Sequence, residues 1–341
     1  MSLSTNGAPL ARRGRTLVTG AAGLIGSNVV RLLNERGVDD AVVADRLHAS
    51  PKWRNLVPLR FADYLEADDF LERLERDASA FGELATVLHL GACSATTETD
   101  ASYLIRNNYE YTKRLARVAV GAGARFVYAS SAATYGGLET DLSERRPLAT
   151  LRPLNMYGYS KHLFDCYAER EGWLDRIVGL KFFNVFGPGE AHKGSMRSLV
   201  HKAFFEIRAT GTVKLFKSYR TEFADGRQRR DFLGVDDAVR MTLHLAEQPA
   251  AAGLYNVGSG ASATWIDLVT PIFATLGLPV RVDFVDMPEA IRDKYQYDTQ
   301  ADLARLRASG YAAAVMPLDE TVASYVRVLL AEHGRSAAPV A

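Results

Sequence analysis

Short apolar runs alternate with longer amphipathic segments along the first half of the chain. The runs at 16–19, 41–44 and 86–90 are four or five residues long, and each ends at a small or acidic residue. Apolar runs of this length are typical of strands that are buried on both faces of a parallel sheet. The segments at 27–35 and 70–78 repeat apolar residues with a helical period. Alternating strands and helices of this kind predict an α/β fold with a parallel sheet.

The pattern continues beyond these segments and then changes. Further elements are expected as a long helix at 101–120 and as strands at 59–63, 125–129, 177–183 and 254–258. The pair Gly187-Pro188 is a strong break, and after it the alternation loosens. We therefore predict a Rossmann-type doubly wound parallel sheet with a smaller mixed α/β substrate-binding lobe.

The expected domain boundaries follow this change. The nucleotide-binding domain is expected at 15–182, with returning segments at about 233–260 and 295–310. The substrate-binding lobe is expected from 183–232, 261–294 and 311–330. The ends of the chain are expected to be a disordered extension at 1–14 and a flexible tail at 331–341.

Composition and charge narrow the classes of function. A chain of 341 residues is long enough for one large or two modest domains. Its net charge of +1 provides no global field that would attract nucleic acid or a membrane surface, and no apolar run reaches the length of a membrane span. The two cysteines, Cys93 and Cys166, show neither a disulfide framework nor metal-ligand spacing. Because the segment at 1–14 lacks the apolar core of a signal peptide, we expect a cytoplasmic protein without a metal site.

The segment at 20–26 reads Gly-x-x-Gly-x-x-Gly between an expected strand and an expected helix. This is the context of a dinucleotide-binding turn. Gly20 permits the tight turn, Gly23 lets the backbone approach a pyrophosphate, and Gly26 lets the helix pack close to the strand. The helix N-terminus offers free N–H groups and a positive dipole end to the phosphates.

The residues after the second strand bear on the choice of nicotinamide cofactor. Asp45 stands about twenty positions after the glycines, where a carboxylate usually binds the ribose hydroxyls of NAD. Arg46 follows it directly, Lys52 lies a few residues further on, and both are able to neutralise the 2′-phosphate of NADP. We predict NADP as the cofactor. The alternatives are that NAD binds instead, or that Arg46 and Lys52 are solvated loop cations without a role in binding.

Two more strand ends supply candidate cofactor contacts. Asp63 is expected to end the strand at 59–63, where its carboxylate can accept a hydrogen bond from adenine. The stretch at 91–94 consists of small residues that let the chain pass close to the cofactor phosphates. Cys93 lies in this stretch but has no basic neighbour that would favour a thiolate, so we assign it no chemistry.

Tyr157 and Lys161 are the candidate acid/base pair. They are four positions apart in an expected helix, which places them on one face. A nearby ammonium favours ionisation of a phenol, so the tyrosine can act as an acid or base at neutral pH. Ser131 follows the strand at 125–129 and lies beyond the carboxyl edge of the sheet, where ligands bind in open α/β sheets.

These motifs together resemble the extended short-chain dehydrogenase/reductase superfamily, which also has an Asn-Val pair like that at 184–185. Within it, the sequence is similar to the ADP-glycero-manno-heptose 6-epimerase family over roughly residues 15–330. The matching stretches are GACSATTE at 91–98, YASSAATYGG at 128–137, YGYSK at 157–161, HKGSM at 192–196 and YQYDTQADL at 295–303.

The resemblance implies inversion of C6″ in an ADP-linked heptose, a step towards lipopolysaccharide core precursors. Bound NADP would take a hydride from C6″, the resulting 6″-ketone would turn over, and the hydride would return to its other face. Because the carbonyl oxygen then lies on the opposite side, one fixed tyrosine cannot reach both positions. The resemblance implies that Tyr157 serves one epimer and Lys193 the other, and it leaves open which epimer each serves.

The resemblance also implies roles for further residues. Ser131 would hydrogen-bond the reacting oxygen, and Lys161 would hold the nicotinamide ribose and lower the pKa of Tyr157. Substrate contacts are implied for Asn184, Ser195, Phe216, Arg230 and Tyr295. Cofactor contacts are implied for Leu24, Ile25, Asp45, Arg46, Lys52, Leu90, Gly91, Ala92, Cys93, Ser94, Asn107, Lys161, Val185 and His192. The family forms homo-oligomers, so a pentamer is expected.

Other functions remain open. A UDP-hexose 4-epimerase would use the same cofactor chemistry with Tyr157 as its only base. A sugar-nucleotide 4,6-dehydratase would need an Asp-Glu pair after Ser131, where Ala132-Ala133 stands. A non-catalytic NADP-binding regulator on the same fold is a third alternative. The loop at 217–229 is a few residues longer than is usual in the family, so the detailed sugar contacts are also open.

Overall fold

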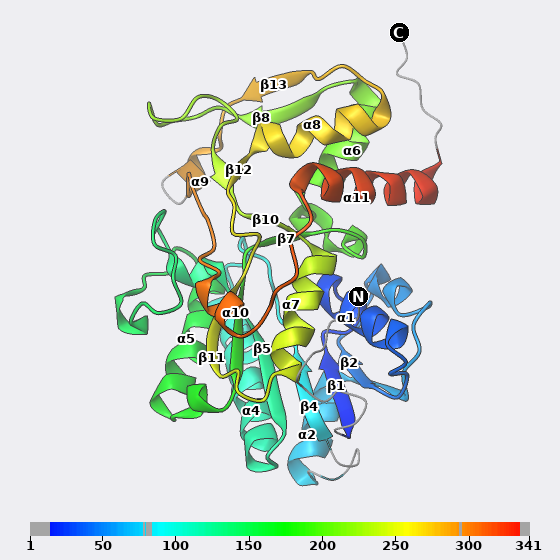
Figure 1. The fold of residues 1–341 in the computed structure, drawn as a ribbon, viewed down its shortest axis with the longest axis vertical. Helices are drawn as coiled ribbons and strands as arrows, with labels where there is room; N and C mark the ends of the chain where they lie inside the picture. Colours follow the sequence, from blue (N-terminus) through cyan, green and yellow to red (C-terminus); the bar gives the residue numbers. More distant parts are fainter. Residues whose placement is uncertain (1–13, 78, 80–83, 293–294, 335–341) are drawn as a thin grey trace.

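The computed structural model describes residues 14–77, 79, 84–292 and 295–334. A parallel seven-stranded sheet forms the larger part of the molecule (Figure 1). Its strands, in spatial order, are β3 (Asp63–Glu66), β2 (Val42–Asp45), β1 (Arg15–Thr19), β4 (Leu84–His89), β5 (Arg125–Ser131), β6 (Val178–Phe182) and β11 (Gly253–Val257). The strand order reverses between β1 and β4, which creates the crevice where doubly wound sheets bind nucleotides.

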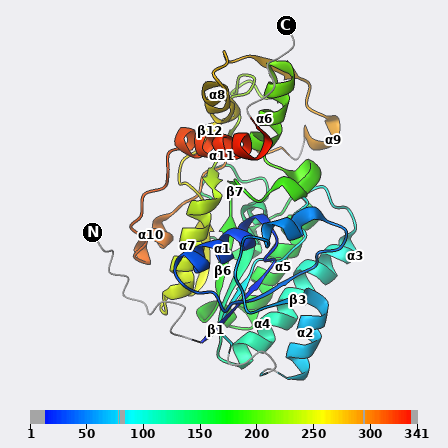
Figure 2. The same ribbon diagram turned by 90° about the vertical axis from the view of Figure 1, so that its right-hand side faces the viewer.

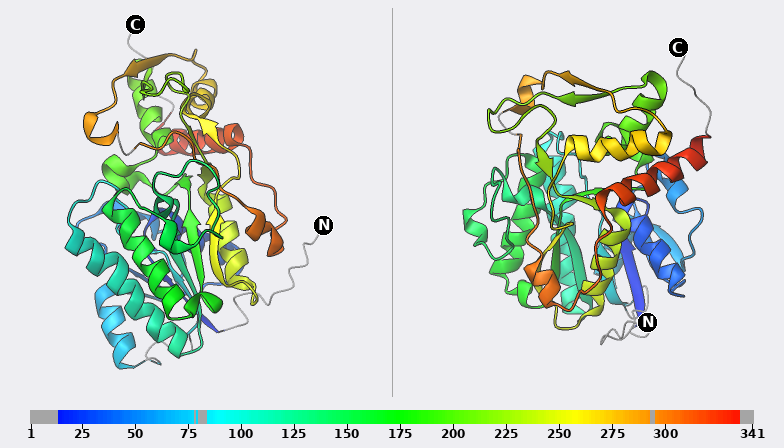
Figure 3. Two further views of the ribbon diagram at one scale, coloured as in Figure 1. Left: turned by 90° about the vertical axis from the view of Figure 1, so that its left-hand side faces the viewer. Right: turned by 45° about the horizontal axis from the view of Figure 1, so that its top comes forward.

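Helices cover both faces of this sheet. Figure 2 looks onto the face covered by α1 (Leu24–Glu35) and α7 (Val235–Glu247). The left view of Figure 3 looks onto the other face, which is covered by α2 (Ala67–Arg76), α4 (Tyr111–Gly121) and α5 (Met156–Arg170). The short helix α10 (Ala304–Ala308) packs beside β11. Central strands such as β6 are therefore buried on both sides, which explains their largely apolar sequences; in β6 the exception is Lys181.

A smaller lobe lies beyond the carboxyl ends of the strands (Figure 1). Three helices, α6 (Leu199–Thr210), α8 (Trp265–Leu276) and α11 (Leu318–His333), share its apolar core. The parallel strands β8 (Val213–Phe216) and β13 (Val282–Val285) lie at its outer side. The described residues also form the strand pairs β7 (Asn184–Phe186) with β10 (Phe232–Gly234) and β9 (Arg229–Arg230) with β12 (Ala263–Thr264). They include the one-turn helices α3 (Ala101–Leu104) and α9 (Glu289–Arg292) as well.

The predicted fold class is confirmed, the predicted strand at 59–63 is wrong, and the predicted helix at 101–120 is present but interrupted. The third strand is β3 rather than 59–63, because β3 is an edge strand that pairs only with β2 and has a half-exposed, polar sequence. Instead of one helix at 101–120, a π-helical segment at Ile105–Glu110 separates α3 from α4. Among the described residues, no helix has both the length and the apolar character of a membrane span.

The expectations for the two ends of the chain are only partly covered by the structure. Residues 1–13 and 335–341 lie outside the described residues. Residues 331–333, which we expected in the flexible tail, form the last turn of α11. The domain boundaries remain predictions, although β11, α7 and α10 do come from the segments expected to return to the sheet.

Candidate active site

A cleft of about 1010 Å³ lies between the carboxyl edge of the sheet and the smaller lobe. Most of the residues that the sequence singled out line it. From the sheet domain these are Gly20, Gly23, Leu24, Ile25, Gly26, Asp45, Lys52, Leu90, Gly91, Ala92, Cys93, Ser94, Ser131, Tyr157 and Lys161. From the segments beyond residue 183 these are Asn184, Val185, His192, Lys193, Phe216, Arg230 and Tyr295. Four candidates, Arg46, Asp63, Asn107 and Ser195, are not among the lining residues.

The glycines at the bottom of the cleft are required by close backbone contacts. Gly20 has a φ of +68°, and a Cβ added to it would lie 2.5 Å from the backbone nitrogen of Gly91. A Cβ added to Gly26 would lie 2.1 Å from the carbonyl oxygen of Gly20. Helix α1 begins after Gly23, and no side chain of the described residues caps it. The cradle therefore fits a dinucleotide pyrophosphate, which would take the free N–H groups of the first turn.

Asp45 holds this cradle in place. One of its carboxylate oxygens accepts a hydrogen bond from the backbone nitrogen of Ala22 at 2.8 Å. The other accepts from the Lys52 ammonium at 2.8 Å and from the Arg46 backbone at 2.7 Å. Lys52 therefore lies where the adenosine ribose of a bound cofactor would be expected, with its charge balanced by a single carboxylate.

Arg46 and Asn107 are placed differently from the prediction. The Arg46 guanidinium forms an ion pair with Asp68 on α2 and donates to the side-chain oxygen of Asn107. Its carbon lies 4.8 Å from the centre of the Tyr111 ring. Arg46 thus supports the rim of the cleft rather than facing it, because α2 supplies a nearby carboxylate.

The position expected for Asp63 is wrong. Asp63 begins β3, in register with Val42 at the start of β2, so it lies at the edge of the sheet opposite the cleft. Glu66 is the residue at the carboxyl end of this strand, in register with Asp45. Ser195 is exposed, and its carbonyl accepts a hydrogen bond from Lys202 at 3.4 Å.

Ser131, Tyr157 and Lys161 come together at one side of the cleft. Ser131 ends β5, whereas Tyr157 and Lys161 lie on consecutive turns of α5, which begins at an Asn155 cap. The Ser131 side chain acts on the Tyr157 hydroxyl and favours its ionisation. The Lys161 ammonium donates to the carbonyl oxygen of Ala129 at 2.7 Å. This is the arrangement that proton transfer to or from a substrate hydroxyl requires.

The electrostatics of this group differ from the prediction in one respect. Burial raises the pKa of Tyr157, and the interaction with the Ser131 side chain offsets only part of that effect. Burial lowers the pKa of Lys161 to about 8, against the opposing influence of Asp165. The expected lowering of the Tyr157 pKa by Lys161 is therefore wrong for this arrangement, because desolvation of the phenol dominates.

A buried ion pair supports the same group from below. Asp165 follows Lys161 by one helical turn and accepts hydrogen bonds from Tyr128, Ser130 and Lys181, each at 2.8 or 2.9 Å. Both members of the Asp165–Lys181 pair are inaccessible to solvent. The pair joins α5 to β5 and β6 next to Ser131.

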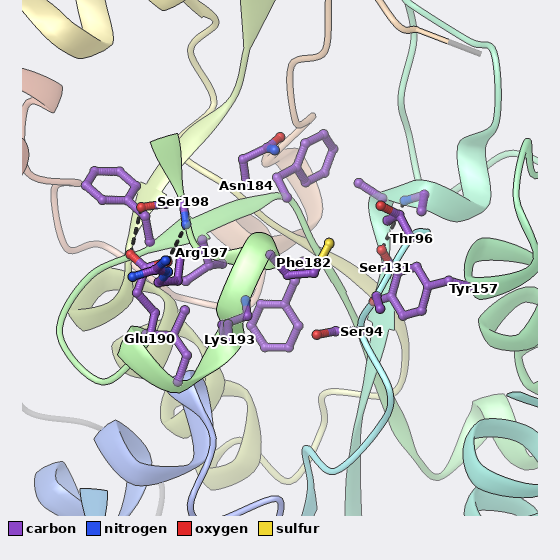
Figure 4. Close-up of a pocket in the computed structure, with 18 of the residues that line it drawn as sticks. Ser94, Thr96, Ser131, Tyr157, Phe182, Asn184, Glu190, Lys193, Arg197 and Ser198 are labelled. Carbon is purple, nitrogen blue, oxygen red and sulfur yellow. Dashed lines mark hydrogen bonds between the residues drawn. The ribbon is translucent and has the colours of Figure 1, made fainter. Parts of the chain in front are cut away.

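Lys193 reaches the cleft from the other side. It lies in the short helical segment Ala191–Met196, which follows β7. Figure 4 shows Ser131 and Tyr157 on one side of the cleft and Lys193 on the other, with Phe182 between them in this view. Burial lowers the pKa of the Lys193 amine, and the nearby Glu190 carboxylate opposes this shift. Two groups that can exchange protons thus face one cavity from different directions.

Arg230 marks the lobe end of the cleft. It is 8% exposed, and its guanidinium carbon lies 4.8 Å from the centre of the Tyr295 ring. It donates a hydrogen bond to the carbonyl oxygen of Arg229 at 2.8 Å, and no carboxylate of the described residues forms an ion pair with it. Burial lowers the pKa of this guanidinium. The Glu139 and Asp298 carboxylates act on this cation only from a distance, and a buried cation without a direct ion pair favours an anionic ligand such as a diphosphate.

The glycine cradle and the serine–tyrosine–lysine group lie in the part of the chain that matches a known family. Residues 16–258 match the family described as NAD dependent epimerase/dehydratase. The chain belongs to this family. Its members' dependence on a nicotinamide cofactor agrees with the cradle at Gly20 and with the position of Lys161.

The chain is similar to individual proteins over nearly its whole length. It is 46% identical over 316 residues to the ADP-L-glycero-D-manno-heptose-6-epimerase of Nitratidesulfovibrio vulgaris, covering 92% of this chain and 98% of that protein. The crystal structure of the same-named enzyme from Helicobacter pylori is similar, with a TM-score of 0.77, 25% identity and coverage of 93% and 96%. MoeE5 in complex with UDP-glucose and NAD is also similar, with a TM-score of 0.72, 27% identity and coverage of 94% and 99%.

Sequence reasoning missed two residues that shape the site. Asn108, in the π-helical segment, bonds both the backbone nitrogen and the carbonyl of Cys93 and also the Ser160 hydroxyl, at 2.9 to 3.0 Å. It thereby fixes the stretch 91–94 against α5. Glu190, beside Lys193, is buried and was not singled out. An asparagine pair in a long helix is the one signal that pointed to Asn108, because amides in helix interiors usually have a specific partner.

Proposed function

We propose that this protein is an ADP-L-glycero-D-manno-heptose 6-epimerase that inverts C6″ through transient oxidation. The observation that carries this proposal is the opposition of Tyr157 and Lys193 across one cleft (Figure 4). Proton donors on both sides of the cleft suit a ketone whose oxygen lies on one side before it turns over and on the opposite side afterwards. The similarity to the heptose epimerases of two organisms supports the identity of the sugar.

The proposed roles of the residues follow from their positions. With one epimer bound, Tyr157 takes the proton from the C6″ hydroxyl, and Ser131 steadies the same oxygen by a hydrogen bond. A nicotinamide cofactor held by the glycine cradle and Lys161 would supply the reversible hydride transfer at C6″. After the ketone turns over, its oxygen lies on the other side, and Lys193 gives it a proton. Running the steps in reverse interconverts the roles of the two residues.

The proposed substrate orientation places the diphosphate at Arg230. This buried guanidinium has a planar set of donors suited to phosphate oxygens. Phe216 and Tyr295 line the cleft beside it and offer faces for the nucleoside and sugar. Asn184 lines the cleft and is a proposed sugar contact, whereas Ser195 does not line it, which gives no support to the contact expected for it.

NADP is the proposed cofactor. Lys52 lies on the cleft next to Asp45, where a 2′-phosphate on the adenosine ribose would find a cation. Arg46 supports this preference only indirectly, because its charge is engaged by Asp68. Lys161 is the proposed contact to the nicotinamide ribose. The nucleotide released when the purified protein is denatured, identified by mass spectrometry, tests this proposal.

The proposed setting is the cytoplasm, in the synthesis of heptose precursors of lipopolysaccharide core. We further propose a homo-oligomer, with a pentamer as the expected state. Sedimentation equilibrium of the purified chain tests that state. A monomer or dimer across the accessible concentration range would contradict it.

Separate assays with two nucleotide sugars test the proposed activity. Purified protein is offered ADP-D-glycero-D-manno-heptose and UDP-galactose, and inversion is followed by nuclear magnetic resonance. Turnover of the heptose with inversion at C6″ is expected, and turnover of UDP-galactose alone would contradict it. The double substitution Tyr157→Phe with Lys193→Met should abolish inversion. Tyr159→Phe is the matched control, since Tyr159 lies on the same helix and is 44% exposed.

A further inference from the structure

The segment that carries Lys193 is too short and irregular to hold its own shape. It spans Ala191–Met196, and Gly194 interrupts it with φ 55° and ψ −126°. Backbone bonds tie it to its flanks at Lys193, which donates to the Glu190 carbonyl at 2.9 Å, and at Arg197, which donates to the Gly194 carbonyl at 3.3 Å. Placement of the Lys193 amine must therefore come from the two ends of the segment.

Glu190 joins these two ends. Its side chain is 1% exposed. One carboxylate oxygen accepts the Ser198 hydroxyl at 2.7 Å and the Gly187 backbone at 3.4 Å, and the other accepts the Ser198 backbone nitrogen at 2.5 Å. Residues 191–197 thus form a loop that is closed by one buried carboxylate, as Figure 4 shows for Glu190 and Ser198.

Both ends of the closed loop are anchored elsewhere. On the sheet side, Asn28 of α1 donates to the carbonyl of Pro188 at 2.9 Å, and Asn55 donates to that of Gly189 at 2.8 Å. On the lobe side, the Ser198 hydroxyl caps α6 by accepting from the His201 backbone at 3.2 Å. Glu190 therefore connects a turn fixed on the nucleotide-binding cradle to the first turn of a lobe helix.

Glu190 is also the acidic residue nearest to Lys193 in the sequence. The Lys193 backbone nitrogen donates to the Glu190 carbonyl at 2.9 Å. Burial lowers the pKa of Lys193, and the negative charge of Glu190 works in the opposite direction. The charged and titratable groups that surround Glu190 are Lys193, Arg197, His201 and, on α11, Tyr325.

We propose that Glu190 is a positioning residue for Lys193, and that it thereby controls the half of the reaction that Lys193 serves. This proposal rests on the proposed function and deepens it. The Ser131–Tyr157 side of the cleft is held by different contacts, from Asp165 and Asn155. Loss of the Glu190 carboxylate should therefore affect the two epimers unequally, which a general loss of stability would not do.

The test separates the two half-reactions. Purified protein with its bound cofactor is mixed rapidly with each C6″ epimer, and the absorbance of reduced nicotinamide is followed. The epimer that depends on Lys193 is first identified with Lys193→Met. In Glu190→Gln, which has one acceptor oxygen instead of two, cofactor reduction by that epimer should slow about 100-fold, the cost of misplacing a catalytic group by about 1 Å. Reduction by the other epimer should keep the wild-type rate.

Asp267→Asn is the matched control. Asp267 also bonds the backbone nitrogen and the hydroxyl of the capping residue of a lobe helix, Thr264 at the start of α8. It should slow neither half-reaction. Equal slowing of both epimers by Glu190→Gln, or slowing of neither, would overturn the proposal. Should Glu190→Gln fail to fold, Ser198→Ala removes one of the donors to Glu190 and should slow the same epimer selectively.

A second measurement does not need the heptose. Competitive acetylation with mass-spectrometric detection gives the pH midpoint of labelling for Lys193. Because the Glu190 anion stabilises the ammonium, Glu190→Gln should move this midpoint to lower pH, whereas Asp267→Asn should leave it unchanged. An unchanged midpoint in Glu190→Gln would overturn the proposal. If the wild-type protein reduces its cofactor with neither epimer, the proposed function fails, while this labelling result still decides the placement of Lys193.

Discussion

The buried ion pair between Asp165 and Lys181, beneath the active site, gives a prediction about the stability of the protein. Asp165 has no exposed surface and accepts from Tyr128, Ser130 and Lys181. In Asp165→Asn the Lys181 ammonium, also inaccessible, loses its counter-charge, and its other partners are the neutral Thr134 hydroxyl at 2.6 Å and the face of the Tyr135 ring. Removing one partner of a buried pair typically costs about 3–5 kcal/mol, because the other charge stays buried without compensation.

The assay for this prediction is urea unfolding of the two single variants and the double variant. Asp165→Asn and Lys181→Met should each lower the free energy of unfolding by about 3–5 kcal/mol. The double variant should lose much less than the sum, since replacing both charges removes the uncompensated one. Additive losses, or single losses below about 1 kcal/mol, would refute the argument that the pair is electrostatically coupled.

Three further predictions concern the cleft. Lys161→Met should abolish activity yet raise the free energy of unfolding at pH 7 by about 3 kcal/mol, because the lowered pKa of about 8 makes the buried ammonium costly. Chemical denaturation across pH should show the full gain in the free energy of unfolding below pH 8, and this gain should vanish as the pH approaches 10.5, the ordinary pKa of a lysine. A gain that stays constant with pH would contradict this prediction. Arg230→Met should raise KM for the nucleotide sugar about 10–100-fold, as expected for a lost charge-assisted bond, without lowering Tm; a large drop in Tm would show that Arg230 is mainly structural. Lys52→Met should weaken NADP binding in calorimetry by about 10–100-fold and leave NAD binding little changed; equal effects on both would contradict the 2′-phosphate role.

Local sequence was sufficient where a residue's role depends on its immediate neighbours. The glycines at 20 and 26 were predicted correctly, because the strand–turn–helix context alone demands a tight turn and a close contact. Tyr157 and Lys161 were placed correctly on one helix face because four residues make about one turn. The Rossmann sheet followed from the alternation of apolar runs and amphipathic helices.

Prediction failed where a partner is distant in sequence. The charge of Arg46 is taken by Asp68, twenty-two positions later, and only the packing of α2 beside β2 brings the two together. Asp63 was placed at the wrong end of its strand, because pairing with β2, not apolar content, sets the ends of an edge strand. The direction of the Tyr157 pKa was wrong because burial cannot be read from spacing.

The most important residue that local patterns did not reveal is Glu190. In the sequence it is an acidic residue in a loop, which is usually solvated. Its burial arises from contacts with Ser198 and Gly187 that close the Lys193 loop. A family resemblance could identify Lys193, but the reason why that lysine is held in place required the structure.

The central claim is inversion at C6″ with internal return of the hydride, and isotope tracing tests it most directly. ADP-D-glycero-D-manno-heptose carrying deuterium at C6″ is incubated with the purified protein, and the product is examined by nuclear magnetic resonance. The account predicts inverted configuration at C6″ with full retention of the deuterium, because the hydride stays on the bound cofactor between its two transfers. Loss of the label to solvent, or an unchanged configuration at C6″, would contradict it.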